Sequence, residues 1–210
     1  MLVDGSDLYI RFNGKTQLVL AAGDTLNVSQ SSVLGTNRNN SALLKTSVNA
    51  TDQITAAVAF NSDQESLFTG MDDYGDHLFV TARSRAPATF EHPTAPFTVE
   101  TENYAGPMDP PNYKLDGFIW QLNKSDLSLV DSFRTNGPGD ESLFDIHVKS
   151  TTEVFAATLF ADSLRFEGVD TALAYNPNLT FWDAAWTRFS FPNVMTVGRP
   201  ETAVATPNFG

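Results

Sequence analysis

Apolar residues occur along this chain in short runs that are separated by polar turn residues. The runs are rich in β-branched and aromatic residues, as in HLFVTA at 77–82 and EVFAATL at 153–159, and this composition is typical of β-strands. No long stretch shows the 3.6-residue apolar period of a helix. The pattern therefore predicts an all-β protein.

The strand pattern repeats. The tetrapeptide ESLF occurs at 65–68 and again at 141–144, an offset of 76 residues. The same offset aligns three later pairs, which are Phe79 with Phe155, Phe90 with Phe166 and Glu91 with Glu167. Repetition in phase over this length predicts a repeated supersecondary unit. It also predicts that Phe68, Phe144, Phe79 and Phe155 are buried between sheets at equivalent positions.

Each unit contains four short apolar runs. They lie at 66–71, 77–82, 117–123 and 127–133 in one copy, and at 142–148, 153–159, 171–176 and 181–189 in the next. A meander of four antiparallel strands, repeated along the chain, is the blade pattern of β-propellers. We therefore expect repeated four-stranded antiparallel blades in a β-propeller or propeller-like fold, with a β-sandwich as the alternative.

The repeat divides the chain into one domain and a tail. The domain covers 1–198 and contains about three blades, at 1–60, 61–133 and 139–189, followed by a closing or edge strand at 193–197; residues 199–210 form the tail. The segment 193–197 occupies the place of the first strand of a further unit. The segments 23–40 and 92–114 are polar or proline-rich, so we expect surface loops there.

Several of these elements resemble one family. The matching segments are Gly139-Asp140-Glu141, Asp73 to Asp76, LFVTA at 78–82, DGFIWQLN at 116–123 and SFRTNGPGDE at 132–141. Their order is similar to that of the β-propeller repeats called SBBP. The resemblance covers about residues 60–190. It implies a propeller fold and a frequent location at the cell surface or outside the cell, and it implies no reaction.

The charge and the cysteine content narrow the function classes. A net charge of −12 without a cluster of Lys and Arg disfavours nucleic-acid binding. The apolar runs are too short to span a membrane as helices. The absence of cysteine excludes disulfides and thiolate chemistry.

No catalytic constellation is evident, so we expect no enzymatic activity and no cofactor. His77, His92 and His147 have no metal-ligand spacing, and neither a nucleophile elbow nor a phosphate loop occurs. Glu65 and Glu141 recur at the same place in successive units. This recurrence favours carboxylates that cap or bridge neighbouring blades over a glycosidase pair.

Two acidic turns are candidate calcium loops, formed by Asp4 and Asp7 and by Asp72, Asp73 and Asp76. Calcium needs six to eight oxygen ligands, and these turns lack the register of an EF-hand. Asp is also common in hairpin turns because its side chain bonds to the local backbone. The turn interpretation is favoured, and calcium stays the alternative.

Two groups of residues are candidates for contact with sugars. Trp182 and Trp186 are four residues apart and so share one face of a strand, where they could stack on sugar rings; Trp120 lies in an apolar run and is expected to pack between blades. Sequons for N-glycosylation begin at Asn27, Asn39, Asn49, Asn123 and Asn178. The last three fall in the turn between the third and fourth expected strands, where Asn is also a favoured turn residue.

Taken together, the sequence predicts a non-enzymatic structural or adhesive module, located outside the cell or on its surface, that is part of a larger assembly. The expected partners are other copies of the chain or neighbouring segments of a longer chain, and glycans. A carbohydrate-binding, lectin-like propeller and a viral or phage surface protein are the alternatives. For the former, an exposed Trp182 or Trp186 beside a polar pocket would be the distinguishing feature.

Overall fold

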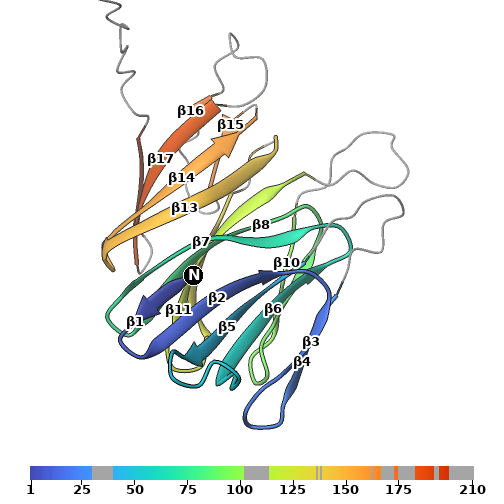
Figure 1. Cartoon of the computed structure of the whole chain (residues 1–210). Helices are drawn as coiled ribbons and strands as arrows, with labels where there is room; N and C mark the ends of the chain where they lie inside the picture. The colour runs from blue at the N-terminus through green and yellow to red at the C-terminus, as the bar shows by residue number, and fades with distance from the viewer. Residues whose placement is uncertain are drawn as a thin grey trace, which may run out of the picture.

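The computed structural model describes residues 1–29, 40–101, 114–135, 137, 139–161, 163–166, 173–174, 183–191 and 194–198. Throughout this part of the chain the regular elements are β-strands, which form three main antiparallel sheets and two small hairpin sheets (Figure 1). The predicted all-β class is confirmed. Within the same residues the sheets neither close into a ring nor take the radial arrangement of a propeller.

The first sheet contains six strands in the order β1, β2, β5, β6, β9 and β10. These are β1 (Leu2–Asp4), β2 (Asp7–Asn13), β5 (Ser41–Ser47), β6 (Ala56–Ser62), β9 (Ala88–Glu91) and β10 (Phe97–Val99). A separate hairpin of β3 (Thr16–Val19) and β4 (Thr25–Val28) covers one face of this sheet. Thus the segments expected as loops at 23–40 and 92–114 contain the strands β4 and β10.

The second and third sheets are four-stranded meanders. The second has the order β12, β11, β8, β7, from β7 (Ser66–Tyr74), β8 (His77–Ser84), β11 (Asp116–Asn123) and β12 (Leu129–Arg134). The third has the order β13, β14, β17, β18, from β13 (Glu141–Ser150), β14 (Glu153–Phe160), β17 (Asp183–Ser190) and β18 (Val194–Gly198). The hairpin of β15 (Ser163–Leu164) and β16 (Leu173–Ala174) lies between β14 and β17 in the chain.

The third sheet corrects the strand order expected from the sequence. The segment 181–189 was expected as the fourth strand, but β17 pairs directly with β14 and is therefore the third. The segment 193–197 was expected to begin another unit, whereas β18 pairs with β17 as the fourth strand. Within 171–176, only β16 is described, and it pairs with β15 outside this sheet.

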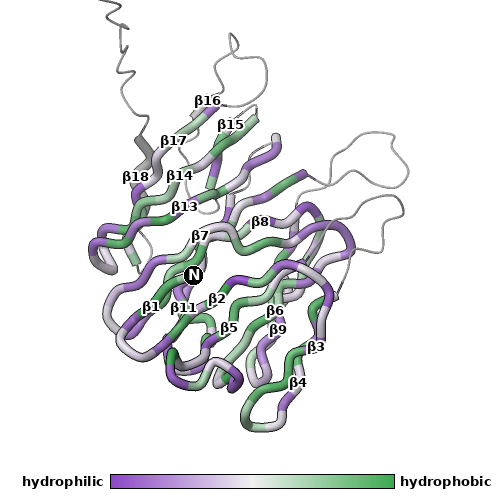
Figure 2. Tube along the Cα trace, in the orientation of Figure 1, coloured by the Kyte–Doolittle hydropathy of each residue, from purple (hydrophilic) through white to green (hydrophobic). Residues whose placement is uncertain are grey.

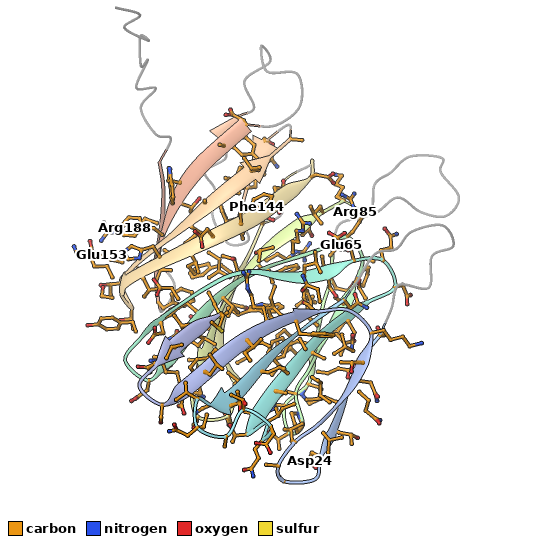
Figure 3. The ribbon with its side chains drawn as sticks, viewed as in Figure 1. Asp24, Glu65, Arg85, Phe144, Glu153 and Arg188 are labelled. Atoms are coloured by element: carbon orange, nitrogen blue, oxygen red, sulfur yellow. The ribbon has the colours of Figure 1, made fainter. Side chains whose placement is uncertain are left out.

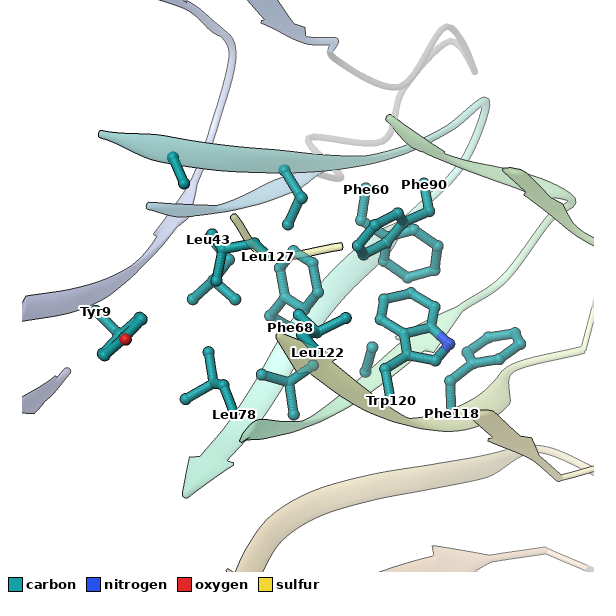
Figure 4. Close-up of a cluster of buried hydrophobic side chains, with 14 of the residues drawn as sticks. Tyr9, Leu43, Phe60, Phe68, Leu78, Phe90, Phe118, Trp120, Leu122 and Leu127 are labelled. Atoms are coloured by element: carbon teal, nitrogen blue, oxygen red, sulfur yellow. The ribbon is translucent and has the colours of Figure 1, made fainter. Parts of the chain in front are cut away.

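The first and second sheets pack face to face around an aromatic core (Figure 4). Trp120 of β11 is fully buried at its centre, with the Phe60 ring 4.8 Å away and the Phe90 ring 5.0 Å away, both edge-on. Edge-to-face contacts of this kind add to the free energy gained by burying the rings. Figure 2 shows the resulting pattern along the trace, with hydrophobic strands and hydrophilic hairpin turns.

The other face of the second sheet packs on the third. Phe79 and Ile119 are fully buried in a second core with Leu143, Val154 and Phe189 of the third sheet. Gly70 of β7 lets the backbones approach closely, because a Cβ there would lie 2.9 Å from the Cα of Asp145. Since the second sheet is covered on both faces, seven of the eight residues of β11 are buried.

The two copies of ESLF pair with their neighbouring strands in registers that differ by one residue. In the second sheet Phe68 pairs with Ala82 and Gly70 with Thr81, which leaves Thr69 as a bulge. In the third sheet Leu143 pairs with Thr158 and Asp145 with Ala157, which leaves Phe144 as the bulge. A one-residue slip moves a side chain to the opposite face of a sheet.

Two of the four phenylalanines expected in the core are buried there, and the slip explains why Phe144 is not. Phe68 is only 3% exposed and Phe79 is fully buried, as expected. Phe144 is 42% exposed, so the expectation is wrong for this residue. Phe155 is only partly buried, because it lies on the face of β14 that points away from the second sheet, so the expectation of burial between sheets is wrong for this residue too.

Candidate functional site

The outer face of the third sheet corresponds to a buried face of the second. Phe155 occupies the same place on β14 as Phe79 on β8, since β14 follows β8 by 76 residues. In β17, Trp186 pairs with Ala157, just as Ile119 in β11 pairs with Thr81. Ile119 is fully buried between two sheets, whereas the equivalent Trp186 is 53% exposed.

Apolar residues cover this outer face. A groove of about 320 Å³ on this face is lined by Phe144, Ala157, Thr158, Leu159, Ala184, Ala185 and Trp186. Alternate residues along β14 and β17 point to this side, as their burial pattern shows. We call the face formed by Phe144, Phe155, Ala157, Leu159, Ala184 and Trp186 the outer face.

One end of the outer face is charged. Glu153 pairs with Lys149 at 2.9 Å and with Arg188 at 3.4 Å, and Figure 3 shows Glu153 and Arg188 together at this end of the sheet. A hydrogen bond from Lys149 and the charge of the same residue lower the pKa of Glu153 below its ordinary value. The apolar groove is thus bordered by a polar rim, which is the usual plan of a protein interface.

Two aspartates that the sequence did not single out for this role, Asp72 and Asp140, connect the second and third sheets. Asp72 accepts a hydrogen bond from the backbone N–H of Val148 at 2.7 Å. Asp140 pairs with Arg85 at 3.3 Å and accepts a hydrogen bond from the N–H of Leu115.

The two recurring glutamates are not equivalent in space. Glu65 is partly exposed and pairs with Arg83 at 3.2 Å, whereas Glu141 is fully buried. With the one-residue slip, Glu141 corresponds to Ser66, which begins β7 as Glu141 begins β13.

The acidic turns surround a lysine. Lys124 forms ion pairs with Asp4 and Asp73, and Asp7 pairs with Lys45 at 2.9 Å. Burial alone would lower the pKa of Lys124, but the hydrogen bonds to both carboxylates raise it above its ordinary value. Among the described residues no group of three or more acidic or histidine side chains is placed to hold a metal ion.

The three histidines make different contacts. His92 is buried, and its Nδ1 accepts hydrogen bonds from the N–H groups of Thr94 and Ala95 while Nε2 lies 2.9 Å from the carbonyl of Asp126. His92 therefore joins two turns. His147 is exposed beside Asp72, and His77 contacts the edge of Phe79.

The structure describes part of the candidate sugar sites. Trp186 is exposed, but the groove beside it is apolar rather than polar. Asn27 and Asn49 are exposed, and Asn123 is half-buried with its amide donating to the Ser128 hydroxyl at 2.8 Å. Trp182, Asn39 and Asn178 lie outside the described residues.

A second hollow was missed by sequence reasoning. It lies where β2, β7 and β8 meet the bulge of β13 and contains Arg11, Arg83 and Phe144. These residues are far apart in the sequence, and the alignment of ESLF placed Phe144 in the core. No local pattern in the chain indicates that they meet.

Comparisons of the chain with protein-family models, with curated proteins and with solved structures found no match. In the described part of the chain, no helix is long and apolar enough to cross a membrane.

Proposed function

We propose that the chain is a non-enzymatic structural module, located at the cell surface or outside the cell, that assembles through the outer face of its third sheet. Its sheets are then blade-type units in an open, propeller-like stack. The occupant of the outer face is the same face of a second copy. The exposure of Trp186 at the position of the buried Ile119 carries this proposal.

The packing inside the chain supports it. The equivalent face of the second sheet is covered by the third, which buries Phe79 and Ile119. Burying apolar surface yields roughly 25 cal/mol per Å², so an uncovered Trp186 and Leu159 favour association. An apolar patch with a polar rim marks a site of protein contact.

The surroundings of Trp186 also bear on the lectin alternative. Sugar recognition needs polar groups that hydrogen-bond the hydroxyls beside an aromatic ring. Among the residues that line the groove next to Trp186, Thr158 is the polar one besides the indole itself, and its hydroxyl is buried. Protein packing is therefore favoured over sugar stacking at this face. The exposed sequons at Asn27 and Asn49 support an extracellular or surface location.

Sedimentation velocity over a range of concentrations tests the proposal. We expect the native chain to associate, and Trp186→Lys to sediment as a monomer because a charge cannot be buried in an apolar interface without a partner. Val130→Lys is the matched control, since Val130 is 46% exposed on β12, away from the outer face. A native chain that is monomeric up to its solubility limit, or equal effects of both substitutions, would overturn the proposal.

A further inference from the structure

Two hollows meet at Arg83 and Phe144. One, of about 360 Å³, contains Arg11, Asn13 and Ile10 from β2 together with Leu67 and Thr69 from β7. The other, of about 380 Å³, contains Glu65, Arg85 and Ser142. We call the first the arginine hollow. Figure 3 shows Phe144 on the third sheet facing the region of Glu65 and Arg85.

The bulge in β13 supplies an aromatic wall. Because Phe144 is the extra residue of this bulge, its ring leaves the core and stands in the hollow. The guanidinium of Arg83 lies 5.6 Å from the centre of the ring, within the range of a cation–π contact. Bulges often redirect a side chain toward a binding site.

The arginine hollow is positively charged, although the chain as a whole is acidic. Arg11 makes one long hydrogen bond, of 3.5 Å, to the carbonyl of Phe68, and no ion pair of Arg11 is found within the described residues. Arg83 pairs with Glu65, yet its Nε is buried without a hydrogen-bond partner in the same part of the chain. No carboxylate is among the residues that form the hollow.

These donors favour a carboxylate as the ligand. The guanidinium fork of Arg matches the two oxygens of a carboxylate, and Arg11 is free to form this pair. Arg83 already pairs with Glu65 and donates a hydrogen bond to the Ser142 hydroxyl at 3.3 Å, so it contributes positive charge beside Arg11 rather than a free donor. The ring of Phe144, which the Arg83 guanidinium already contacts, is an apolar wall of the hollow against which a ring beside the carboxylate can pack.

We propose that the arginine hollow binds a carboxylate carried on a ring, with Arg11 holding the acid, Arg83 adding positive charge and Phe144 packing on the ring. A uronic acid residue of a polysaccharide and a free cyclic acid share this chemistry. Phe144 also belongs to the outer face, so the two sites are adjacent; Arg11 lies in the arginine hollow alone, and its substitution tests the hollow without altering the outer face.

Isothermal titration tests the site with three probes: trigalacturonate, cyclohexanecarboxylate and the neutral galactotriose. We expect one or both acids to bind and the neutral sugar not to bind. Binding of trigalacturonate alone indicates a polysaccharide ligand, and binding of both acids indicates that carboxylate and ring suffice. Failure of both acids, or equal binding of the neutral sugar, overturns the proposal.

Variants assign the binding to the hollow. Arg11→Gln and Phe144→Ala should each weaken the acid at least tenfold, and both should fold because the two side chains are not in the core. Arg188→Gln removes the same charge from the outer face and should bind as the native chain does. If all three variants bind equally, the ligand lies elsewhere and the proposal fails. The circular dichroism of each variant confirms that it is folded.

Discussion

The two copies of ESLF provide an internal comparison, because they place the same residue type in opposite environments. Phe68→Ala and Phe144→Ala make the same chemical change at positions aligned by the sequence. Phe68 is 3% exposed, with the rings of Phe60 and Trp120 5.8 Å and 5.7 Å away. Phe144 is 42% exposed, because it is the extra residue of a bulge.

The expected losses of unfolding free energy differ several-fold. Truncating a fully buried Phe leaves a cavity and costs about 3–5 kcal/mol, so we expect this range for Phe68→Ala. For Phe144→Ala we expect about 1 kcal/mol or less, since surface substitutions usually have small effects. A domain of this kind has a total stability of roughly 5–15 kcal/mol, so the first variant is measurable and the second is nearly native.

Urea denaturation followed by tryptophan fluorescence measures both losses. The urea concentration at the unfolding midpoint should fall strongly for Phe68→Ala and little for Phe144→Ala. The slope of the unfolding free energy against urea concentration should stay unchanged, which shows that the unfolded states are comparable. Equal losses for the two variants would refute the one-residue slip and restore the alignment of the two copies without a shift.

Two further predictions concern pH and glycosylation. Burial and the nearby charge of Asp7 raise the pKa of Tyr9 to about 12. The stabilising contribution of Tyr9 is therefore complete below the ordinary tyrosine pKa near 10 and is lost as the pH rises to about 12. In urea titrations, Tyr9→Phe should remove about 2–3 kcal/mol of this alkaline loss of unfolding free energy, and an unchanged loss would contradict the prediction. When the chain is secreted from a eukaryotic host, mass spectrometry should find glycan on the exposed Asn49 and little on Asn123, whose amide is hydrogen-bonded to Ser128. The reverse occupancy would show that this hydrogen bond does not protect Asn123.

The sequence predicts the second sheet well, because its signals are local. The expected strands at 66–71, 77–82, 117–123 and 127–133 correspond to β7, β8, β11 and β12. Each is a short apolar run, and the β7–β8 and β11–β12 pairs are neighbours in the chain, although β11 pairs with β8 across the intervening β9 and β10. The family resemblance stays a prediction, since no comparison bears on it, whereas the sheets of the described residues do not confirm the β-propeller arrangement.

Longer-range pairing explains most of what the sequence did not predict. The first sheet gains β9 through its pairing with β6, across the intervening β7 and β8. In the third sheet the offset of 76 residues holds for β14 but not for β17, because the connection between them differs in length from that between β8 and β11. The arginine hollow depends on the same bulge that displaces Phe144, and bulges have no clear sequence signal here.

The two ends of the stack differ, and this difference limits the kind of assembly. On the first sheet the β3–β4 hairpin buries Ala57 and Ala59 under Leu26 and Val28, so that end is capped. On the third sheet Trp186 is exposed. A chain with one capped and one apolar end cannot add copies head to tail. The apolar ends of two copies can instead pack against each other about a twofold axis. The sedimentation experiment should therefore find a dimer that does not grow with concentration; a ladder of larger species would mean that the hairpin does not cap the first sheet.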